Sequence, residues 1–589
     1  MPAARSAALA VLLITLITFV SGLCPSPYWL DSSEFAAAAV LLGVAHPPGH
    51  PLALLLGKAA SLLPLGPLAL RVGAAQAVCA ALAAALLVFV GVRIAVRTAV
   101  ALGACADELP AWPLALAAAG AALCTSLGYA VAFQAVRPEV YALHRLLAVV
   151  ALLGLLRHDE GDHRGLLLCG LAGGLGLTNH HFLTLLFLVP LPLVLRGPGL
   201  FRAVIASALL GLAALLLYAY LPLRAAQHPL INWGAPDSPE RLLWVISARA
   251  FQKSVREPTG EDADVFGALV EQVGLVGIVL ALGGLYLLCR QQSTRRLGAF
   301  LVAVVLLHAG GRAVLGFDVA NPDAHGYLVP AGDALALAGC AAFGGLLRLL
   351  LWLRRPGAAL PAGVGLLLAG LLWGVREPQR IDRSDFWDLD TLIGSWLEDA
   401  PPRARLLSAN FQTVFGLWYL MGVEGRRPDV EHWHPHFLAY PGYREDLLRR
   451  FPLVADLPDL LGERALRVAP LLRSARRRPT LFEYDLDTPP ELAKHLVPLG
   501  LAEAVGTAIA REPLEWTQQR RRAVYERLNL EEPETRRTLL WRSFVHAALA
   551  CQQGDRTTYE VEVKRARALL RGGTSRELDD MDQRCHQNP

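Results

Sequence analysis

Long uninterrupted runs of apolar residues constrain the fold of this chain more than any other feature of its sequence. Residues 72–92 and 203–221, for example, contain no charged side chain. A helix of roughly 20 such residues matches the thickness of the hydrocarbon core of a bilayer. Only 18% of the 589 residues are charged, whereas soluble domains contain roughly 25%. The chain is therefore expected to be an integral membrane protein.

The apolar runs are too long and alternate too little for the strands of a transmembrane barrel. Because hydrocarbon offers no hydrogen-bond partners, each crossing segment is expected to be a helix that satisfies its own backbone. The sequence thus predicts a polytopic α-helical membrane protein with about eleven crossings, the first of them an uncleaved helix rather than a signal peptide. The expected crossings lie near residues 7–23, 72–92, 111–131, 140–156, 165–178, 182–195, 203–221, 266–289, 298–316, 328–350 and 358–375.

Arginine residues in the short connections predict the orientation of these helices. If the N-terminus is cytoplasmic, every second connection is rich in arginine, as the positive-inside rule requires. These connections hold Arg93 and Arg97, Arg157 and Arg164, Arg196 and Arg202, Arg290, Arg295 and Arg296, and Arg348, Arg354 and Arg355. The loops 24–71, 132–140, 222–265 and 317–327 then face the outside. An odd number of crossings places the C-terminal region outside as well.

The composition changes at Arg376, after which no run is long and apolar enough to cross a membrane. Strand-like pieces at 405–408 and 480–484 predict a small α/β region, and amphipathic segments such as 514–528 and 535–552 predict helices. The expected domains are a transmembrane domain, an extracytoplasmic α/β region and a helical C-terminal region, at residues 1–375, 376–487 and 488–589.

The charge balance and the cysteines exclude several classes of function. Lys and Arg number 55 against 51 Asp and Glu, so we expect no nucleic-acid partner. The nine cysteines stand singly, mostly in apolar runs, without a CxxC motif or a Cys/His cluster. They predict neither a disulfide framework nor a zinc site. The excess of arginine over lysine indicates a coding bias that is typical of a bacterial source.

The first outer loop carries the most conspicuous polar residues beside lipid, where functional groups of membrane proteins gather. Asp31 and Glu34 are three residues apart, so both carboxylates point to one face of a helix. One interpretation is a capping box, in which Asp31 caps the helix and Glu34 reaches back to its amide. In the other, one carboxylate is a general base. The residues alone leave both interpretations open.

The order of the motifs along the chain is more specific than any one of them. The sequence D-S-x-E-F at 31–35 is followed by H-P-P-G-x-P at 46–51. Further matching segments are Leu62-Leu63-Pro64-Leu65-Gly66 with Arg71, Arg137-Pro138-Glu139-Val140-Tyr141, Gly176-Leu177-Thr178-Asn179-His180-His181, Leu221-Pro222-Leu223-Arg224, Ile231-Asn232-Trp233-Gly234 and Arg427-Pro428-Asp429-Val430. Together they resemble a family of transmembrane O-mannosyltransferases of the secretory pathway.

This resemblance implies a GT-C type glycosyltransferase. Such an enzyme takes a sugar from a polyprenyl-phosphate carrier and inverts its anomeric centre, with a carboxylate of the first outer loop. On that pattern Asp31 is the catalytic candidate and Glu34 the second. The sequence departs from the family in having Leu30 where a Gly usually precedes the Asp, and His50 where an aromatic residue is usual. The departures leave the acidic pair intact and bear on acceptor specificity.

Cations or dipoles are needed to stabilise the departing phosphate. The candidates for donor or phosphate binding are Arg137, Arg224, His181 and His46. The candidates for a substrate groove are His50, Glu139, Tyr141, Asn179, His180, Asn232, Trp233, Asp318 and Tyr327. Structural alternatives stay open, namely an Arg137–Glu139 ion pair, a polar break between short helices at 179–181, and solvated loops around Asn232 and Asp318. No cofactor is expected and no spacing requires a metal, although a divalent ion at Asp31, Glu34 and Asp318 stays open.

The expected function is transfer of a sugar, with mannose favoured, from a polyprenyl-phosphate carrier to an extracytoplasmic acceptor, with protein Ser/Thr favoured. The expected partners are membrane lipid, the lipid-linked sugar and a protein or glycan acceptor. The expected location is a bacterial inner membrane, with the active site and the C-terminal domain on the outer face. The alternatives are transfer to a lipid or cell-wall glycan, a scaffold that does not need Asp31, and a transporter or flippase. A transporter should carry ionisable residues near the bilayer midplane, whereas most predicted spans are nearly free of charge.

The predicted orientation can be tested with reporter fusions. Fusions after Arg97, Arg164, Arg202 and Arg296 should report the cytoplasm, because arginine-rich connections are retained on that side. Fusions after His50 and within 376–589 should report the outside. A cytoplasmic signal from the C-terminal region would contradict the odd number of crossings.

Overall fold

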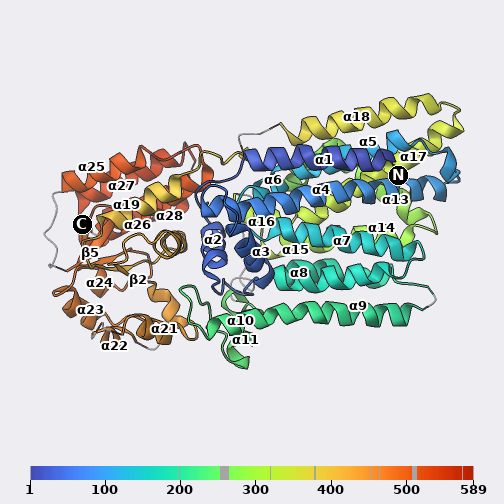
Figure 1. Ribbon diagram of the computed structural model, residues 1–589. Coiled ribbons are helices and arrows are strands. Elements are labelled where there is room, and N and C mark those ends of the chain that lie inside the picture. The colour runs from blue at the N-terminus through green and yellow to red at the C-terminus, as the bar shows by residue number, and fades with distance from the viewer. Residues whose placement is uncertain are drawn as a thin grey trace. The chain divides into compact units, whose positions relative to one another are not determined.

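The chain forms two compact units, each assembled from three segments (Figure 1). A computed structural model describes residues 2–197, 199–252, 264–318, 320–376, 380–452, 454, 456–462, 465–506, 514–573 and 575–587. Unit 1 comprises Met1–Pro25, His46–Leu223 and Ile246–Asp385, and unit 2 comprises Ser26–Ala45, Arg224–Val245 and Phe386–Pro589. Part of the predicted outer loop 222–265 lies outside the described residues, at 253–263.

Helices long and apolar enough to cross a membrane confirm the polytopic helical fold. Within the described residues there are nine, or ten if the bent pair α5 (Ala111–Leu127) and α6 (Tyr129–Ala135) is one span. The nine are α1 (Pro2–Ser21), α4 (Leu68–Ala101), α7 (Tyr141–Asp159), α8 with the turn that follows it (Gly165–Leu193), α9 with α10 (Leu200–Ala225), α13 (Val265–Arg290), α14 with its continuation (Arg295–Val314), α17 (Val329–Trp352) and α18 with the turn before it (Pro356–Gly374). All of them lie before residue 376.

Helix α8 (Gly165–Leu188) doubles back on itself at His180, whose φ of −148° and ψ of 92° are not helical. A Cβ atom built on Gly173 would lie 3.2 Å from the Leu188 side chain. These residues would be about 22 Å apart along a straight helix. Gly176 and Thr184 are in contact in the same way. The two arms coincide with the segments predicted as separate crossings at 165–178 and 182–195, but together they make one candidate span. The described residues therefore hold nine or ten candidate spans where the sequence predicted about eleven.

The arginine-rich connections meet at one end of unit 1. Arg97 pairs with Asp159 at 2.9 Å, and Arg196 pairs with the same carboxylate at 2.8 Å. Arg348 donates a hydrogen bond to the Leu102 carbonyl. Connections that the positive-inside rule assigns to the cytoplasm are therefore neighbours in the fold.

Unit 2 contains a five-stranded sheet in the order β2-β1-β3-β5-β4. Strand β1 (Arg405–Leu407) is parallel to β2 (Glu431–Trp433) and β3 (Thr480–Phe482), whereas β5 (Ala502–Val505) runs antiparallel to β3 and to β4 (Leu496–Leu499). The two strands predicted from sequence are confirmed. The domain boundary predicted at 487 falls inside this sheet, because β4 and β5 follow it and complete the pairing of β3.

Helices cover the sheet and extend the unit. They are α19 (Asp388–Asp399), α20 (Phe411–Leu417), α21 (Tyr443–Arg450), α23 (Val468–Ala475), α25 (Leu514–Tyr525), α26 (Pro533–Gln553), α27 (Arg556–Leu569) and α28 (Arg576–Gln587). Leu407 and Phe482 of the strands share a buried core with Val545 and Leu549 of α26. Parts of two loops that were predicted to face the outside also belong to this unit, and Val44 and Asn232 form a parallel bridge between them. The domain boundary predicted at 375 also differs from the observed one, because unit 1 extends to Asp385 and unit 2 includes two earlier segments of the chain.

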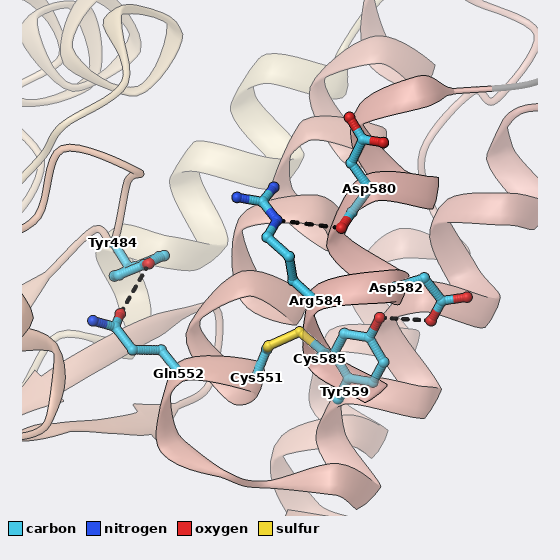
Figure 2. Close-up of a disulfide and its surroundings, with 8 residues drawn as sticks. All are labelled: Tyr484, Cys551, Gln552, Tyr559, Asp580, Asp582, Arg584 and Cys585. Carbon is cyan, nitrogen blue, oxygen red and sulfur yellow. Dashed lines mark hydrogen bonds between the residues drawn. A yellow bond between two sulfur atoms is a disulfide. The ribbon is translucent and has the colours of Figure 1, made fainter. Parts of the chain in front are cut away.

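One disulfide joins α26 to α28, between Cys551 and Cys585 (Figure 2). The cysteine spacing predicted no disulfide framework, which is wrong for this pair; the two cysteines are 34 residues apart and belong to no motif that would have paired them. The Tyr559 hydroxyl of α27 donates to Asp582 of α28 at 2.7 Å. Both contacts fasten the last helix to unit 2.

A buried ion pair lies inside the spans, which the sequence suggested were nearly free of charge. Arg145 of α7 contacts both carboxylate oxygens of Asp333 of α17 at 2.8 Å. The same guanidinium donates to Ser126 at 3.0 Å and to Thr125 at 3.1 Å, both in α5. The Arg145 side chain is 1% exposed. The pair therefore ties three helices together.

Removing one partner should destabilise unit 1 strongly, because the other charge stays buried and unpaired. We expect Asp333→Ala to cost about 3 to 5 kcal/mol, measured as a lower unfolding midpoint of the protein in lipid nanodiscs. Asp162→Ala breaks an exposed pair with Arg157 and should leave the midpoint nearly unchanged. The double change Arg145→Met with Asp333→Leu should recover much of the loss. A double variant as unstable as the single one would contradict this account.

Candidate active site

Helix α2 (Asp31–Leu41) carries both candidate catalytic carboxylates in its first turn. Asp31 is partly exposed, whereas Glu34 is 0% exposed. The N-terminal end of a helix stabilises negative charge there. The helix begins at Asp31 itself, and its N-cap is Leu30, which makes no side-chain cap. The capping box, which needs Asp31 at the N-cap, is therefore not the arrangement found.

Contacts within unit 2 hold both ends of α2. Before the helix, Trp29 donates from Nε1 to the Thr535 hydroxyl at 2.8 Å, and the Leu30 amide donates to Gln412 Oε1 at 2.6 Å. After the helix, Arg224 donates to the Leu42 carbonyl at 2.6 Å. A cation at the C-terminal end of a helix offsets the helix dipole. Arg224, predicted as a phosphate ligand, thus also has a positioning role in this structure.

Leu30 has a backbone conformation that suits glycine. Its φ of 61° and ψ of −144° lie where a side chain is strained. This is the position at which the resembling family usually has Gly. This strained residue immediately precedes Asp31. The hydrogen bond from its amide to Gln412 holds the strained conformation in place at the start of α2.

A histidine–aromatic cluster in unit 1 brings together five predicted site residues, His46, His50, Tyr141, His180 and Tyr327. Neighbouring ring centroids lie 5.0 Å apart for His46 and His50, 5.7 Å for His50 and His180, and 5.5 Å for His180 and Tyr327. Tyr141 lies 5.7 Å from Tyr327. The members come from four distant segments of the chain, which meet because α8 reverses at His180.

Hydrogen bonds fix this cluster. His50 Nδ1 donates to the Asn179 carbonyl at 2.5 Å, and the Asn179 side chain donates to the Val140 carbonyl at 3.0 Å. Burial, together with the rings of His46 and His180, holds the pKa of His50 well below its usual value. His50 is therefore a neutral hydrogen-bonding ring. The polar break predicted at 179–181 is present, with His181 half-buried beside it.

Arg137 lies in a buried network of hydrogen bonds and ion pairs, in agreement with the alternative that it pairs with Glu139. It contacts Glu139 at 3.1 Å and Gln134 at 2.8 Å, and it also bonds to Asp323. Its side chain is 0% exposed. Asp318 accepts a hydrogen bond from the Ala320 amide at 2.9 Å. This contact within a turn fits the alternative that Asp318 lies in a solvated loop. Both observations favour structural roles for these residues.

Asn232 and Trp233 belong to the core of unit 2 rather than to an open groove. Asn232 donates to Asp446 at 2.7 Å. The Trp233 ring is 4% exposed and packs against Phe437 and Tyr440, with centroids 4.6 and 5.4 Å away. The sequence motif therefore marks a packing position here.

Comparison with known proteins identifies the first part of the chain. Residues 31–196 match the sequence model of the protein O-mannosyl-transferase TMEM260 N-terminal domain. This part of the chain is therefore similar to the TMEM260 N-terminal domain. The resemblance inferred from the loop motifs is thereby confirmed, and the matched range begins at Asp31. It contains both carboxylates, His46, His50, Arg137 and the break at 179–181, and it supports the coarser assignment to the membrane glycosyltransferases.

Three solved structures are similar to this chain at low sequence identity. ArnT from Cupriavidus metallidurans in the apo state is 14% identical with a TM-score of 0.49, over 86% of this chain and 98% of that one. The same enzyme bound to undecaprenyl phosphate has a TM-score of 0.46, with equal identity and coverage. Arabinofuranosyltransferase AftD from Mycobacteria is 17% identical with a TM-score of 0.38, over 69% of this chain and 29% of that one. All three TM-scores lie under 0.5, so the assignment rests on the match to the TMEM260 N-terminal domain.

The strain at Leu30 can be tested by comparing two substitutions. Ala keeps the Cβ atom and Gly removes it, so Leu30→Gly should be more stable than Leu30→Ala by about 1 kcal/mol. The measurement is the unfolding midpoint. At Leu62, where φ is −79°, Gly should be no better than Ala. Equal rankings at the two positions would contradict the strain.

Proposed function

We propose that this protein is an inverting glycosyltransferase that moves a sugar from a polyprenyl-phosphate carrier to an extracytoplasmic acceptor. Mannose and a protein Ser/Thr hydroxyl are the favoured donor sugar and acceptor. The proposal is carried by the match to the TMEM260 N-terminal domain, which begins at Asp31 and includes Glu34, both in the first turn of α2. The lipid-linked sugar is a donor substrate rather than a resident cofactor, and a divalent ion at the carboxylates stays an open alternative.

The proposed reaction is a single displacement. Asp31 takes the proton from the acceptor hydroxyl while the hydroxyl oxygen bonds to the anomeric carbon of the sugar. The bond from that carbon to the carrier phosphate breaks on the opposite side, and polyprenyl phosphate leaves with the electron pair. Asp31 is favoured over Glu34 because it is partly exposed, whereas Glu34 is fully buried.

Stabilisation of the leaving phosphate is assigned to His46, His181, Arg137 and Arg224. His46 and His181 are each half-buried, so their rings are accessible for hydrogen bonding. Arg137 is the weakest of these assignments, because Glu139 and Asp323 already occupy its buried guanidinium. The remaining groove residues of the histidine–aromatic cluster are proposed to line the donor or acceptor path.

We place the active site and unit 2 on the extracytoplasmic face of a bacterial inner membrane. The grouping of the arginine-rich connections at one end of unit 1 supports a cytoplasmic assignment for that end. The Cys551–Cys585 disulfide supports an oxidising compartment for unit 2, because disulfides persist outside the cytoplasm.

The transferase proposal predicts that Asp31→Asn loses about 10²-fold or more in turnover, the usual contribution of a general base. Purified protein in nanodiscs would be incubated with polyprenyl-phosphate mannose and a panel of peptides and glycans, and transfer measured by mass spectrometry. Asp237→Asn is a matched control, since it makes the same change at a partly exposed pair with Arg241 in unit 2. It should retain wild-type turnover.

The outcomes separate the alternatives. Loss in Glu34→Gln with full activity in Asp31→Asn would make Glu34 the base. Activity in both variants would contradict a catalytic role for α2. Transfer to glycans but not to peptides would replace the protein acceptor by a lipid or cell-wall glycan.

A further inference from the structure

A cavity of about 340 Å³ lies wholly within unit 2. Its walls include Ala409 and Asn410, which follow strand β1, and residues 483–487, which follow β3. Helix α26 supplies Trp541, Arg542 and His546. The carboxyl ends of parallel strands meet at one edge of a sheet, and this edge is the common place for ligands in open α/β folds. The cavity is thus located where such a sheet binds small molecules.

Of the four acidic side chains in the walls, Glu483 and Glu503 are bonded to basic groups of α26, whereas Asp487 is exposed. Glu483 accepts from the Ala409 and Asn410 amides, both at 2.9 Å, and from Arg542 at 3.2 Å. Glu503 pairs with His546 at 3.0 Å. The cavity therefore has fixed donors and acceptors but little uncompensated charge at these positions.

The pair of His436 and Asp485 continues this pattern at the rim. The two side chains approach to 2.5 Å, and Thr488 also donates to Asp485 at 2.6 Å. The bond to Asp485 raises the pKa of His436 despite partial burial. Burial opposes ionisation of Asp485, but the bonds from His436 and Thr488 outweigh it and lower the pKa of the carboxyl. The two shifts share one cause, the short contact between the ring and the carboxylate.

Exposed aromatic rings complete the walls. Trp541 is 39% exposed and Phe411 is 43% exposed, although both line the cavity. Large aromatic side chains normally bury most of their surface. Rings left open beside fixed hydrogen-bonding groups suit a ligand that has both apolar C–H faces and hydroxyl groups.

We propose that this cavity binds a neutral carbohydrate, with a sugar ring against Trp541 and its hydroxyls bonded to the carboxylate and guanidinium groups of the walls. A phosphate or other anion would meet the carboxylates of Glu483, Glu503 and Asp485. A cation would find those carboxylates already paired. A neutral ligand with several hydroxyl groups is not repelled by the carboxylates and does not need an unpaired charge. None of the lining residues belongs to α2, and the inference does not depend on the transferase activity.

The test is binding of neutral trisaccharides to the full-length protein in nanodiscs prepared without glycosidic detergent. Mannotriose, maltotriose and cellotriose would be titrated and followed by calorimetry, with trilysine and inorganic phosphate as charged comparators. We expect saturable binding of at least one trisaccharide and none of the comparators. Trp541→Ala should weaken that binding about tenfold, and Trp541→Phe should weaken it less because an aromatic face remains.

Trp516→Ala is the matched control, since Trp516 is 45% exposed and belongs to α25, outside the cavity walls. It should bind as the wild type does. Asp31→Asn should also bind normally, so loss of transfer in that variant would leave this inference standing. The inference is overturned if no trisaccharide binds, if Trp541→Ala binds as tightly as the control, or if trilysine or phosphate is preferred.

Discussion

Every backbone N–H and C=O group inside a membrane needs a hydrogen-bond partner within the protein. The reversal of α8 at His180 depends on polar side chains that supply such partners. A break in a helix frees carbonyl and amide groups that hydrocarbon cannot solvate. Here the freed Asn179 carbonyl accepts from His50, and the Asn179 side chain bonds to the Val140 carbonyl. The polar residues at the break therefore make two short arms possible where a long helix would otherwise form. The same bonds fix the histidine–aromatic cluster.

The second constraint concerns α2, whose position is determined by residues far along the chain. Thr535 and Gln412 hold the segment before the helix, and Arg224 holds the carbonyl after it. The candidate catalytic turn therefore belongs to the same unit as the C-terminal sheet. The C-terminal third must therefore be folded for Asp31 to be held in this position.

Paired charges recur throughout both units and serve mainly to position helices. Arg145 with Asp333 and Arg137 with Asp323 are buried in unit 1. Burying one charge alone is costly, whereas a hydrogen-bonded pair offsets much of that cost. Arg145 was visible in the sequence as a charge inside an apolar run, the usual sign of a partnered residue. Its partner is 188 residues away, and no local pattern could have indicated it.

The sequence by itself determined the membrane-spanning character, the apolar segments including both arms of α8, the main strands and the TMEM260-type motif with Asp31 and Glu34. These follow from local composition and spacing, because the length of an apolar run and the order of a motif are carried by neighbouring residues. Only the tertiary structure decided that residues 26–45 and 224–245 join the C-terminal unit, that Cys551 pairs with Cys585, and that Trp233 is a core residue. Those features depend on burial or on contacts between segments that are not neighbours in the sequence, from 34 residues apart for the disulfide to hundreds for the two loops, and neither is encoded in local periodicity. For the same reason the cavity beside Trp541 was invisible until the strands and α26 were placed together.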